Sequence, residues 1–167
     1  MLKIDVQAEE EWDSSQSWDA LVRSAAEAAI AESAYPHLTE AERSVELSIR
    51  LSSDAEVRAL NDEWRDMDKP TNVLSFPLAR PQEFTQAMVA GPELLLGDIV
   101  LARGVCVAEA ADKGISVEHH ATHLLVHGTL HLLGYDHLDD ESAEDMEARE
   151  VRALHRLGIA DPYKVAA

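Results

Sequence analysis

Residues 116–137, SVEHHATHLLVHGTLHLLGYDH, indicate a long helix that ends in a tight turn. His127 and His131 are four residues apart, so on a helix they share one face and can direct ring nitrogens at one ion. Gly134 can adopt the left-handed conformation that ends a helix, and the turn would return His137 to the same point. We therefore predict a metal site with these three histidines as ligands. Three protein ligands leave a fourth position for water, as in catalytic zinc sites.

The same helix carries three further histidines, and its N-terminus is predicted at Ser116, a good capping residue. His123 lies one turn before His127, so these two form an alternative ligand pair, but no turn delivers a third ligand to it. We expect His123 to pack or to support a ligand. His119 and His120 are interpreted as ordinary helix residues.

Outward from this helix, strand and helix patterns alternate along the chain. Strands are predicted at 2–7, 45–52, 72–77 and 94–102. Helices are predicted at 17–33, 54–65, 103–113, from 117 onward, and within 139–158. Residues 78–93 are predicted to form a loop or hairpin connection. The predicted fold is a mixed α/β (α+β) single domain, with about four strands in one sheet and about five helices packed against it.

The chain has a formal net charge of −18, with 32 acidic and 14 basic residues among 167. Broad neutralisation of nucleic-acid phosphates is excluded by this balance. The acidity is uneven, however, because residues 47–80 hold six acids and five bases. A local basic surface is therefore compatible with this stretch.

Location and redox state are predicted from what the chain contains. The N-terminus lacks the pattern of a secretory signal, and no apolar run approaches the length of a membrane span. We expect a cytoplasmic protein. Cys106 is the only cysteine, which excludes an internal disulfide and fits a reducing compartment. We interpret it as a small buried apolar residue.

One large class of zinc proteases has the same three-histidine spacing in the pattern HExxHxxGxxH, where the glutamate is the general base. Here Gly128 occupies the position of that glutamate. A peptidase without this carboxylate would lack the group that activates water, so the sequence favours another reaction. Asp136 is interpreted as a turn, capping or supporting residue more than as a catalytic one.

Three blocks together carry a family resemblance. HGTLHLLGYDH at 127–137, LNDEWRDMDKPTNVLSFP at 60–77 and LLGDIVLA at 95–102 resemble the YbeY family of bacterial endoribonucleases. The resemblance implies one YbeY-like metallo-hydrolase domain over 1–167, with one zinc ion on His127, His131 and His137. It also implies a groove with the histidine helix at one end.

The same resemblance implies a zinc-dependent, single-strand-specific endoribonuclease of 16S rRNA 3′-end maturation and ribosome quality control. Expected partners are rRNA precursors, the small ribosomal subunit and assembly factors, with no membrane and no DNA. Two rivals remain. One is a zinc-dependent peptidase-like hydrolase, and the other is a non-catalytic zinc-containing ribosome-assembly factor.

Catalytic roles are assigned to Arg65 and to the ligand His127. Arg65 stands among acids in WRDMDK, where a surface ion pair is the ordinary interpretation. A guanidinium nevertheless offers two parallel donors to the charge that grows on phosphate oxygens during cleavage, and the resemblance implies this role. Asp98 is expected to be a buried strand carboxylate that needs a partner, as a capping or orienting group.

The segment after Arg65 contains three further polar candidates: Thr71, Asn72 and Ser75. They either hold the turn and strand that present Arg65 or contact RNA. The sequence does not separate these two roles.

Overall fold

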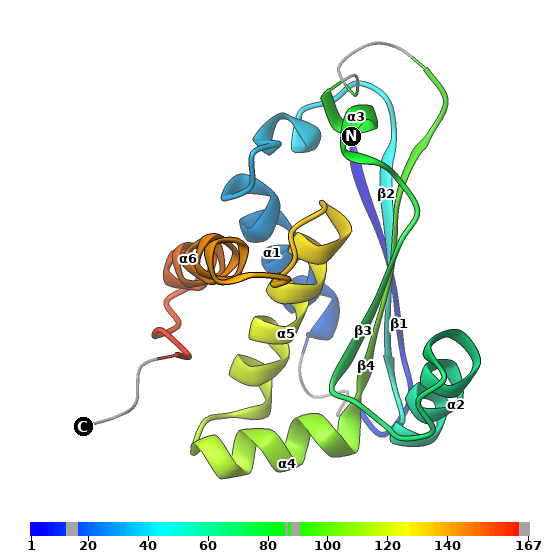
Figure 1. Cartoon of the computed structure of the whole chain (residues 1–167), viewed down its shortest axis with the longest axis vertical. Helices are drawn as coiled ribbons and strands as arrows, with labels where there is room; N and C mark the ends of the chain where they lie inside the picture. Colours follow the sequence, from blue (N-terminus) through cyan, green and yellow to red (C-terminus); the bar gives the residue numbers. More distant parts are fainter. Residues whose placement is uncertain (13–16, 86, 88–90, 164–167) are drawn as a thin grey trace.

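The computed structural model describes residues 1–12, 17–85, 87 and 91–163 (Figure 1). Strands and helices alternate along most of this part of the chain, as the sequence patterns predict. In chain order the elements are β1 (Leu2–Ala8), α1 (Trp18–Ala31), the 3-10 helix η1 (Pro36–Thr39), β2 (Val45–Ser52), α2 (Asp54–Arg65), β3 (Val73–Pro77), α3 (Pro81–Thr85), β4 (Leu94–Ala102), α4 (Arg103–Lys113), α5 (Val117–Leu132) and α6 (Asp140–Arg156).

The four strands form one sheet in the order β1-β2-β4-β3. Strands β1, β2 and β4 are parallel, and β3 runs antiparallel to β4 at one edge. The predicted mixed α/β fold with a four-stranded sheet is therefore confirmed. Each predicted strand and long helix lies within two residues of its observed bounds.

Helices α1, α4, α5 and α6 lie on one side of the sheet, and α2 lies on the other side at one end (Figure 1). Helix α5 packs against β3 and β4 and also contacts α1, α4 and α6. Small residues of α1, among them Ala25 and Ala29, are fully buried in this layer. Because α5 is packed on several sides, its C-terminal end has a fixed place relative to β3.

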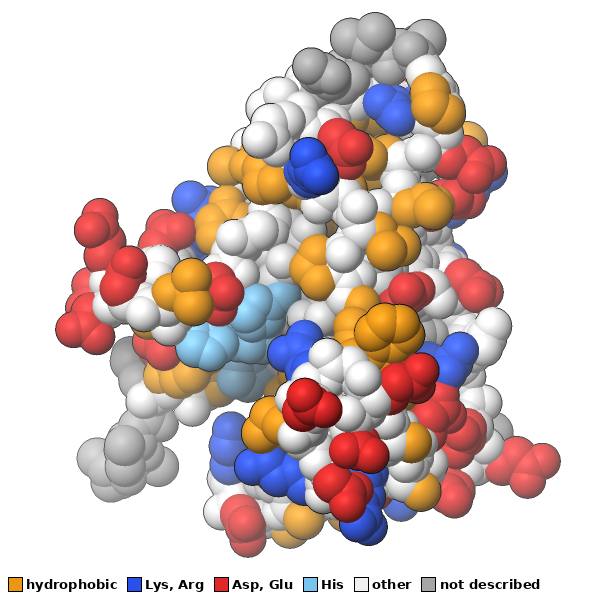
Figure 2. All heavy atoms as spheres, turned by 45° about the vertical axis from the view of Figure 1, so that its right-hand side comes forward, with side chains coloured by type: hydrophobic (Ala, Val, Ile, Leu, Met, Phe, Trp, Pro, Cys, Tyr) orange, Lys and Arg blue, Asp and Glu red, His pale blue; other side chains and the backbone are white. Residues whose placement is uncertain are grey.

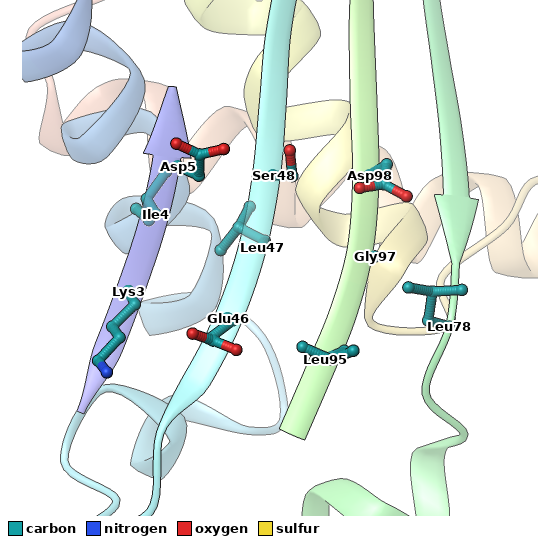
Figure 3. Close-up of a pocket in the computed structure, with 10 residues that line it drawn as sticks. All are labelled: Lys3, Ile4, Asp5, Glu46, Leu47, Ser48, Leu78, Leu95, Gly97 and Asp98. Carbon is teal, nitrogen blue, oxygen red and sulfur yellow. The ribbon is translucent and has the colours of Figure 1, made fainter. Parts of the chain in front are cut away.

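The face of the sheet opposite α5 is open where α2 does not cover it. Figure 3 shows Asp5, Ser48 and Asp98 side by side on this face, with the helices behind the sheet. The prediction that Asp98 is buried is wrong, because Asp98 is exposed although its neighbours Gly97 and Ile99 are buried. Side chains alternate along a strand, and only one face of β4 is covered by helices here.

Two short helices were not predicted. Within 78–93, expected to be a loop or hairpin connection, α3 buries Phe84 completely. The ring of Phe84 packs against Tyr35, next to η1, at a centroid distance of 4.9 Å. Helices of four or five residues contain too little periodicity to be recognised in a sequence. Residues 86 and 88–90 of this segment lie outside the described residues.

No helix within the described part of the chain is long and apolar enough to span a membrane.

Gly97 permits close packing where β4 departs from regular pairing. The β2–β4 register shifts between Glu46 and Leu47, and Gly97 has a φ of 143°. A Cβ atom at Gly97 would lie 2.3 Å from the carbonyl oxygen of Phe76 and 2.8 Å from Leu132 Cδ2. Any side chain here would therefore displace both β3 and α5.

We expect Gly97→Ala to lower the free energy of unfolding by about 3 kcal/mol, because backbone strain and overlap with β3 act together. Urea denaturation measures the loss. Gly114→Ala is the matched control: Gly114 also has a positive φ, of 67°, but its Cβ would meet nothing within 4 Å. Strain alone should cost the control about 1 kcal/mol. Equal losses in the two variants would contradict the packing argument.

Candidate metal centre

The two helical histidines lie together at the C-terminal end of α5. The helix begins where the Ser116 side chain accepts a hydrogen bond from the backbone N–H of His119, as predicted for its cap. The Nε2 atoms of His127 and His131 are 3.0 Å apart, and their ring centroids are 4.5 Å apart. The four-residue spacing thus brings these side chains together on one face.

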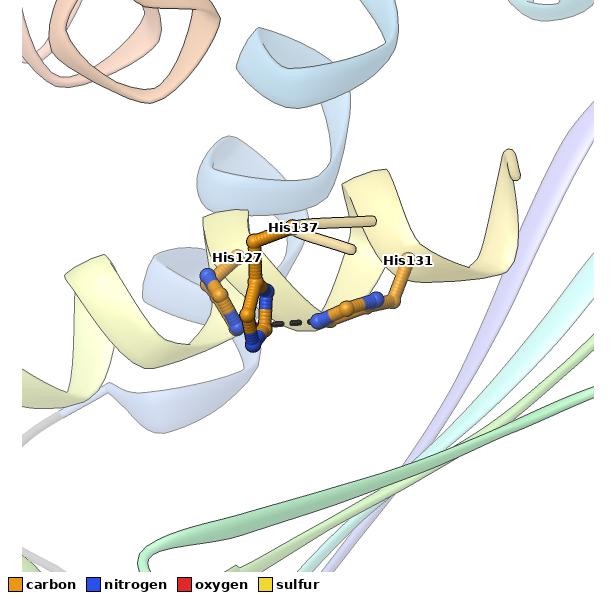
Figure 4. Close-up of side chains that lie close together, drawn as sticks. All are labelled: His127, His131 and His137. Carbon is orange, nitrogen blue, oxygen red and sulfur yellow. Dashed lines mark hydrogen bonds between the residues drawn. The ribbon is translucent and has the colours of Figure 1, made fainter. Parts of the chain in front are cut away.

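A turn at Gly134 returns the chain to these histidines. Gly134 has a φ of 96°, and the N–H of Tyr135 donates to the carbonyl of Leu130 at 3.1 Å. Asp136 Oδ1 accepts from the N–H of His137 at 2.8 Å, so Asp136 stabilises the turn. Figure 4 shows the resulting cluster of His127, His131 and His137. Each offers a ring nitrogen, and these atoms lie within 4.8 Å of one another.

The turn is also stabilised by contacts of Tyr135 with other parts of the chain. The hydroxyl of Tyr135 accepts a hydrogen bond from the N–H of Ala34 at 2.9 Å. The guanidinium carbon of Arg149, on α6, lies 4.8 Å from the centroid of the Tyr135 ring. Arg149 also donates to the carbonyl of Glu32 at 2.7 Å. The turn that presents His137 is therefore attached to α6 and to the segment that follows α1.

The chemistry of the cluster fits a divalent transition metal. Burial lowers the pKa of His131 to about 4, and the nearby His127 acts in the same direction. His131 is therefore neutral at pH 7, with a nitrogen lone pair available for coordination. Three converging imidazoles are a ligand set that zinc accepts, and imidazole also suits other first-row metals. The three histidines can hold a metal ion, and the geometry does not select which one.

Glu150 of α6 contacts this cluster and was not predicted. Its Oε1 is within hydrogen-bond distance of His127 Nδ1, and its Oε2 lies 3.3 Å from His123 Nε2. The Tyr163 hydroxyl donates to the same Oε2. Burial alone would raise the pKa of Glu150, but hydrogen bonds from His123, His127 and Tyr163 outweigh it and hold the pKa at about 2. Glu150 is therefore an ionised carboxylate with no solvent exposure.

A signal for Glu150 was present in the sequence. Met146, Ala153 and Leu154 form the buried face of α6, and Glu150 stands on that face at helical spacing. A charged residue on the apolar face of a helix needs a buried partner. Glu150 was not recognised in the sequence because this helix contains many other acidic residues.

The histidines line a groove of about 680 Å³ that also contains Arg65 and the segment after it. Figure 2 shows the histidines in a hollow with basic side chains beside and below it. Arg65 is the last residue of α2, and its Nη2 donates to the carbonyl of Ser75 at 3.0 Å. Its guanidinium carbon lies 5.7 Å from the centroid of the Phe76 ring. The fold thus brings Arg65 into the same groove as the three histidines, which lie far from it in the sequence.

Arg65 does not have the surface ion pair that its acidic neighbours suggest. Among the described residues, the acid of this segment that forms an ion pair is Asp68, and it pairs with Arg58 at 2.7 Å. Asp66 adopts a left-handed conformation, with a φ of 54°, and ends α2. Arg65 therefore lines the groove, and most of its N–H donors have no hydrogen-bond acceptor among the described residues.

The polar candidates of the 71–75 segment divide between two roles. Asn72 holds the segment in place: its Nδ2 donates to Glu109 at 3.0 Å, and its Oδ1 accepts from the N–H of Val73. The hydroxyls of Thr71 and Ser75 line the groove and form no hydrogen bond within the described part of the protein. These two hydroxyls are available to a ligand.

The other histidines of α5 lie outside the cluster. His119 is exposed, whereas His120 is buried and its Nε2 lies 2.8 Å from Glu109. His123 is buried against Glu150 and Tyr163, so it packs behind the cluster as expected. Cys106 is fully buried, and burial raises the pKa of its thiol to about 12. The interpretation of this cysteine as a core residue is confirmed.

Gly128 faces the sheet and not the groove. A Cβ atom at this position would lie 3.2 Å from two carbons of the Ile99 side chain in β4. The Cβ atom of a glutamate here would contact the buried side chain of Ile99. A side chain at position 128 would therefore leave the helix towards β4 and not towards the groove.

Comparison with known proteins agrees with this geometry. Residues 3–158 match the family model described as Endoribonuclease YbeY. The chain belongs to this family. A relative from Rhizorhabdus wittichii with the same description is 50% identical over 167 residues, covering 99% of this chain and 98% of the relative. A second, from Sphingopyxis alaskensis, is 49% identical and covers 98% of both chains.

A solved structure shows the same fold. The solution structure of a Thermotoga maritima protein matches with a TM-score of 0.55 and 21% identity. The match covers 98% of this chain and 100% of that one. At this identity the likeness concerns the fold alone. The resemblance seen in the three sequence blocks is thus confirmed as family membership by the relatives that share nearly half of all residues.

Proposed function

We propose that the protein is a zinc-dependent endoribonuclease that cleaves unpaired RNA during 3′-end maturation of 16S rRNA and takes part in ribosome quality control. One observation carries the proposal: three metal-competent histidines and a guanidinium without an acidic partner line one groove. The relatives at about half identity are described as endoribonucleases, which supports a nuclease over other hydrolases. The proposed site of action is the cytoplasm, on rRNA precursors within small-subunit particles and with assembly factors.

In this proposal His127, His131 and His137 hold one zinc ion. Zinc, when bound, supplies a Lewis acid that polarises a phosphoryl oxygen and makes water a better nucleophile at neutral pH. His127 contributes to catalysis by offering Nε2 on the groove side while its Nδ1 faces Glu150. The turn at Gly134 fixes His137 through its backbone, so the ligand geometry is set before substrate arrives.

Arg65 is proposed to bind the phosphate that is cleaved. Within the described part of the chain one of its five N–H groups is used, on the Ser75 carbonyl, so the others can form parallel hydrogen bonds to phosphate oxygens. Such donors stabilise the charge that develops on those oxygens in the transition state. The hydroxyls of Thr71 and Ser75 are placed to contact the RNA strand in the same groove.

Two rival functions make different demands on the site. A peptidase needs a general base, and position 128 presents no carboxylate to the groove. A non-catalytic assembly factor needs only a closed structural zinc site. Here the groove borders the histidines, and His137 has 60% of its side chain exposed, so an open coordination position is compatible with the geometry.

Cleavage of a labelled unpaired RNA tests the proposal. Zinc-loaded protein should cleave it, protein stripped by a chelator should not, and added zinc should restore the activity. Arg65→Lys should keep one zinc and an unchanged melting temperature but lose about 100-fold in kcat, because lysine retains the charge without the planar fork.

Arg58→Lys is the matched control, since Arg58 belongs to the same helix but pairs with Asp68. It should cleave at the wild-type rate. Wild-type turnover in Arg65→Lys would reduce Arg65 to a structural contact with Ser75. Zinc-loaded protein that cleaves neither free RNA nor precursor particles would favour the assembly-factor rival.

A further inference from the structure

Glu150 joins three side chains that lie far apart in the sequence. Its side chain, on α6, is fully buried, and its two carboxyl oxygens contact different side chains. Oε1 contacts His127 Nδ1, whereas Oε2 contacts the Tyr163 hydroxyl and lies 3.3 Å from His123 Nε2. A buried carboxylate with this many partners is costly to replace, because removing one partner leaves an unpaired polar group.

The contact with Glu150 determines which nitrogen of His127 carries the proton. Nδ1 of His127 lies within hydrogen-bond distance of Glu150 Oε1, and an imidazole with its proton on Nδ1 donates to this carboxyl oxygen. Nε2 is then left with its lone pair, and it faces Nε2 of His131 at 3.0 Å. The carboxylate thus selects the tautomer that a metal ion requires, and it also fixes the orientation of the ring.

Tyr163 closes the other side of the carboxylate. Its ring meets the ring of His123 edge-on, with centroids 5.5 Å apart and an interplanar angle of 89°. The backbone N–H of Tyr163 donates to Asp161 Oδ1 at 2.8 Å, which stabilises the turn that presents the phenol. Tyr163 is 43% exposed as a residue, yet its hydroxyl points inward to Glu150. The segment after α6 therefore contacts Glu150 and His123, which lie behind the histidine cluster.

We propose that Glu150 is a positioning residue for the metal and that Tyr163 holds Glu150 in place, so the segment at 161–163 is part of the metal site. The inference rests on the proposed zinc site. Carboxylates that accept from a metal-bound histidine commonly change metal affinity by about 10- to 100-fold when they are altered. Tyr163 acts one step further out, so its removal should have a smaller effect.

The test measures zinc affinity by competition with a chromophoric chelator and, in metal-free protein, the tautomer of His127 by ¹⁵N NMR of the imidazole nitrogens. Glu150→Gln should weaken zinc binding about 10- to 100-fold and reduce the Nδ1–H form of His127. Tyr163→Phe removes only the O–H group that donates to Glu150. It should weaken zinc binding a few-fold. If Glu150→Gln does not fold, the zinc affinity of Tyr163→Phe is the test of the proposal.

Glu109→Gln is the matched control. Glu109 Oε1 lies 2.8 Å from Nε2 of His120. His120 belongs to the same helix as His127 but lies outside the metal cluster. This variant should bind zinc as the wild type does. Wild-type affinity and an unchanged His127 tautomer in Glu150→Gln or Tyr163→Phe would overturn the positioning role. Failure of wild-type protein to bind zinc would instead overturn the zinc site itself, so the two failures are distinguishable.

Discussion

Replacement of His131 by alanine is expected to remove most of the zinc and all measurable RNA cleavage. His131 is one of the three proposed ligands, and its loss leaves two imidazoles to hold the ion. The fall in zinc affinity should exceed the 10- to 100-fold that is typical of a supporting residue. Metal analysis of the purified protein and chelator competition measure the effect, with RNA cleavage recorded on the same samples.

Two other histidines of α5 serve as controls for this experiment. His119→Ala changes an exposed residue of the same helix and should retain one zinc per chain. His123→Ala should also retain one zinc, because His123 packs behind the cluster. Full zinc occupancy in His131→Ala would refute the ligand assignment. Loss of zinc in His123→Ala with retention in His131→Ala would move the ligand set one turn towards the N-terminus.

The parts of this molecule that were predictable are those fixed by local sequence. Ser116 and Gly134 mark the two ends of the histidine helix, and both act as predicted. The spacing of His127, His131 and His137 is likewise local, because one helical turn and one glycine turn bring the three together. Strands that alternate or are continuously apolar were also placed within two residues.

The parts that were not predictable depend on which elements pack together. Asp98 was expected to be buried, but a strand pattern does not state which face a helix covers. Arg65 reaches the groove only because α2 ends beside β3, and its proposed role came from guanidinium chemistry and family resemblance, not from its acidic neighbours. The place of Glu150 on the apolar face of α6 is a local signal, but its partner His127 follows only from the packing of α6 against α5.

The geometry of the groove predicts which RNA can react. His127 and His131 lie between the turn at 134–137, which carries the exposed His137, and the segment that holds Arg65, Thr71 and Ser75. A single strand can bend its backbone into such a groove. A duplex holds its phosphates on a stiff helix whose grooves and backbone have a fixed shape, so the reactive phosphate would stay outside.

Charge imposes a second limit on the substrate. With a net charge of −18, the protein cannot hold RNA by broad neutralisation of phosphates. Arg65 lines the groove, and Lys69 lines an adjoining pocket that also contains Arg65, so about two phosphate contacts are expected. For single strands, that number corresponds to a slope of about −1.4 in a plot of log affinity against log salt. Binding should therefore depend on presentation of the strand by the ribosomal particle or a partner.

We accordingly expect unpaired RNA to be cleaved at least about 100-fold faster than the same strand paired with its complement, a difference equivalent to about 2.7 kcal/mol in the barrier. The measurement compares one labelled strand alone, in a perfect duplex, and in a hairpin whose loop carries the same bases. Cleavage should occur in the free strand and the hairpin loop and be absent from the stem. Equal cleavage of the duplex would indicate a general nuclease, whereas zinc-dependent digestion of casein without RNA cleavage would restore the peptidase rival. Faster cleavage of rRNA precursors within particles than of the same RNA free in solution would show that presentation compensates for the weak phosphate contacts of so acidic a protein.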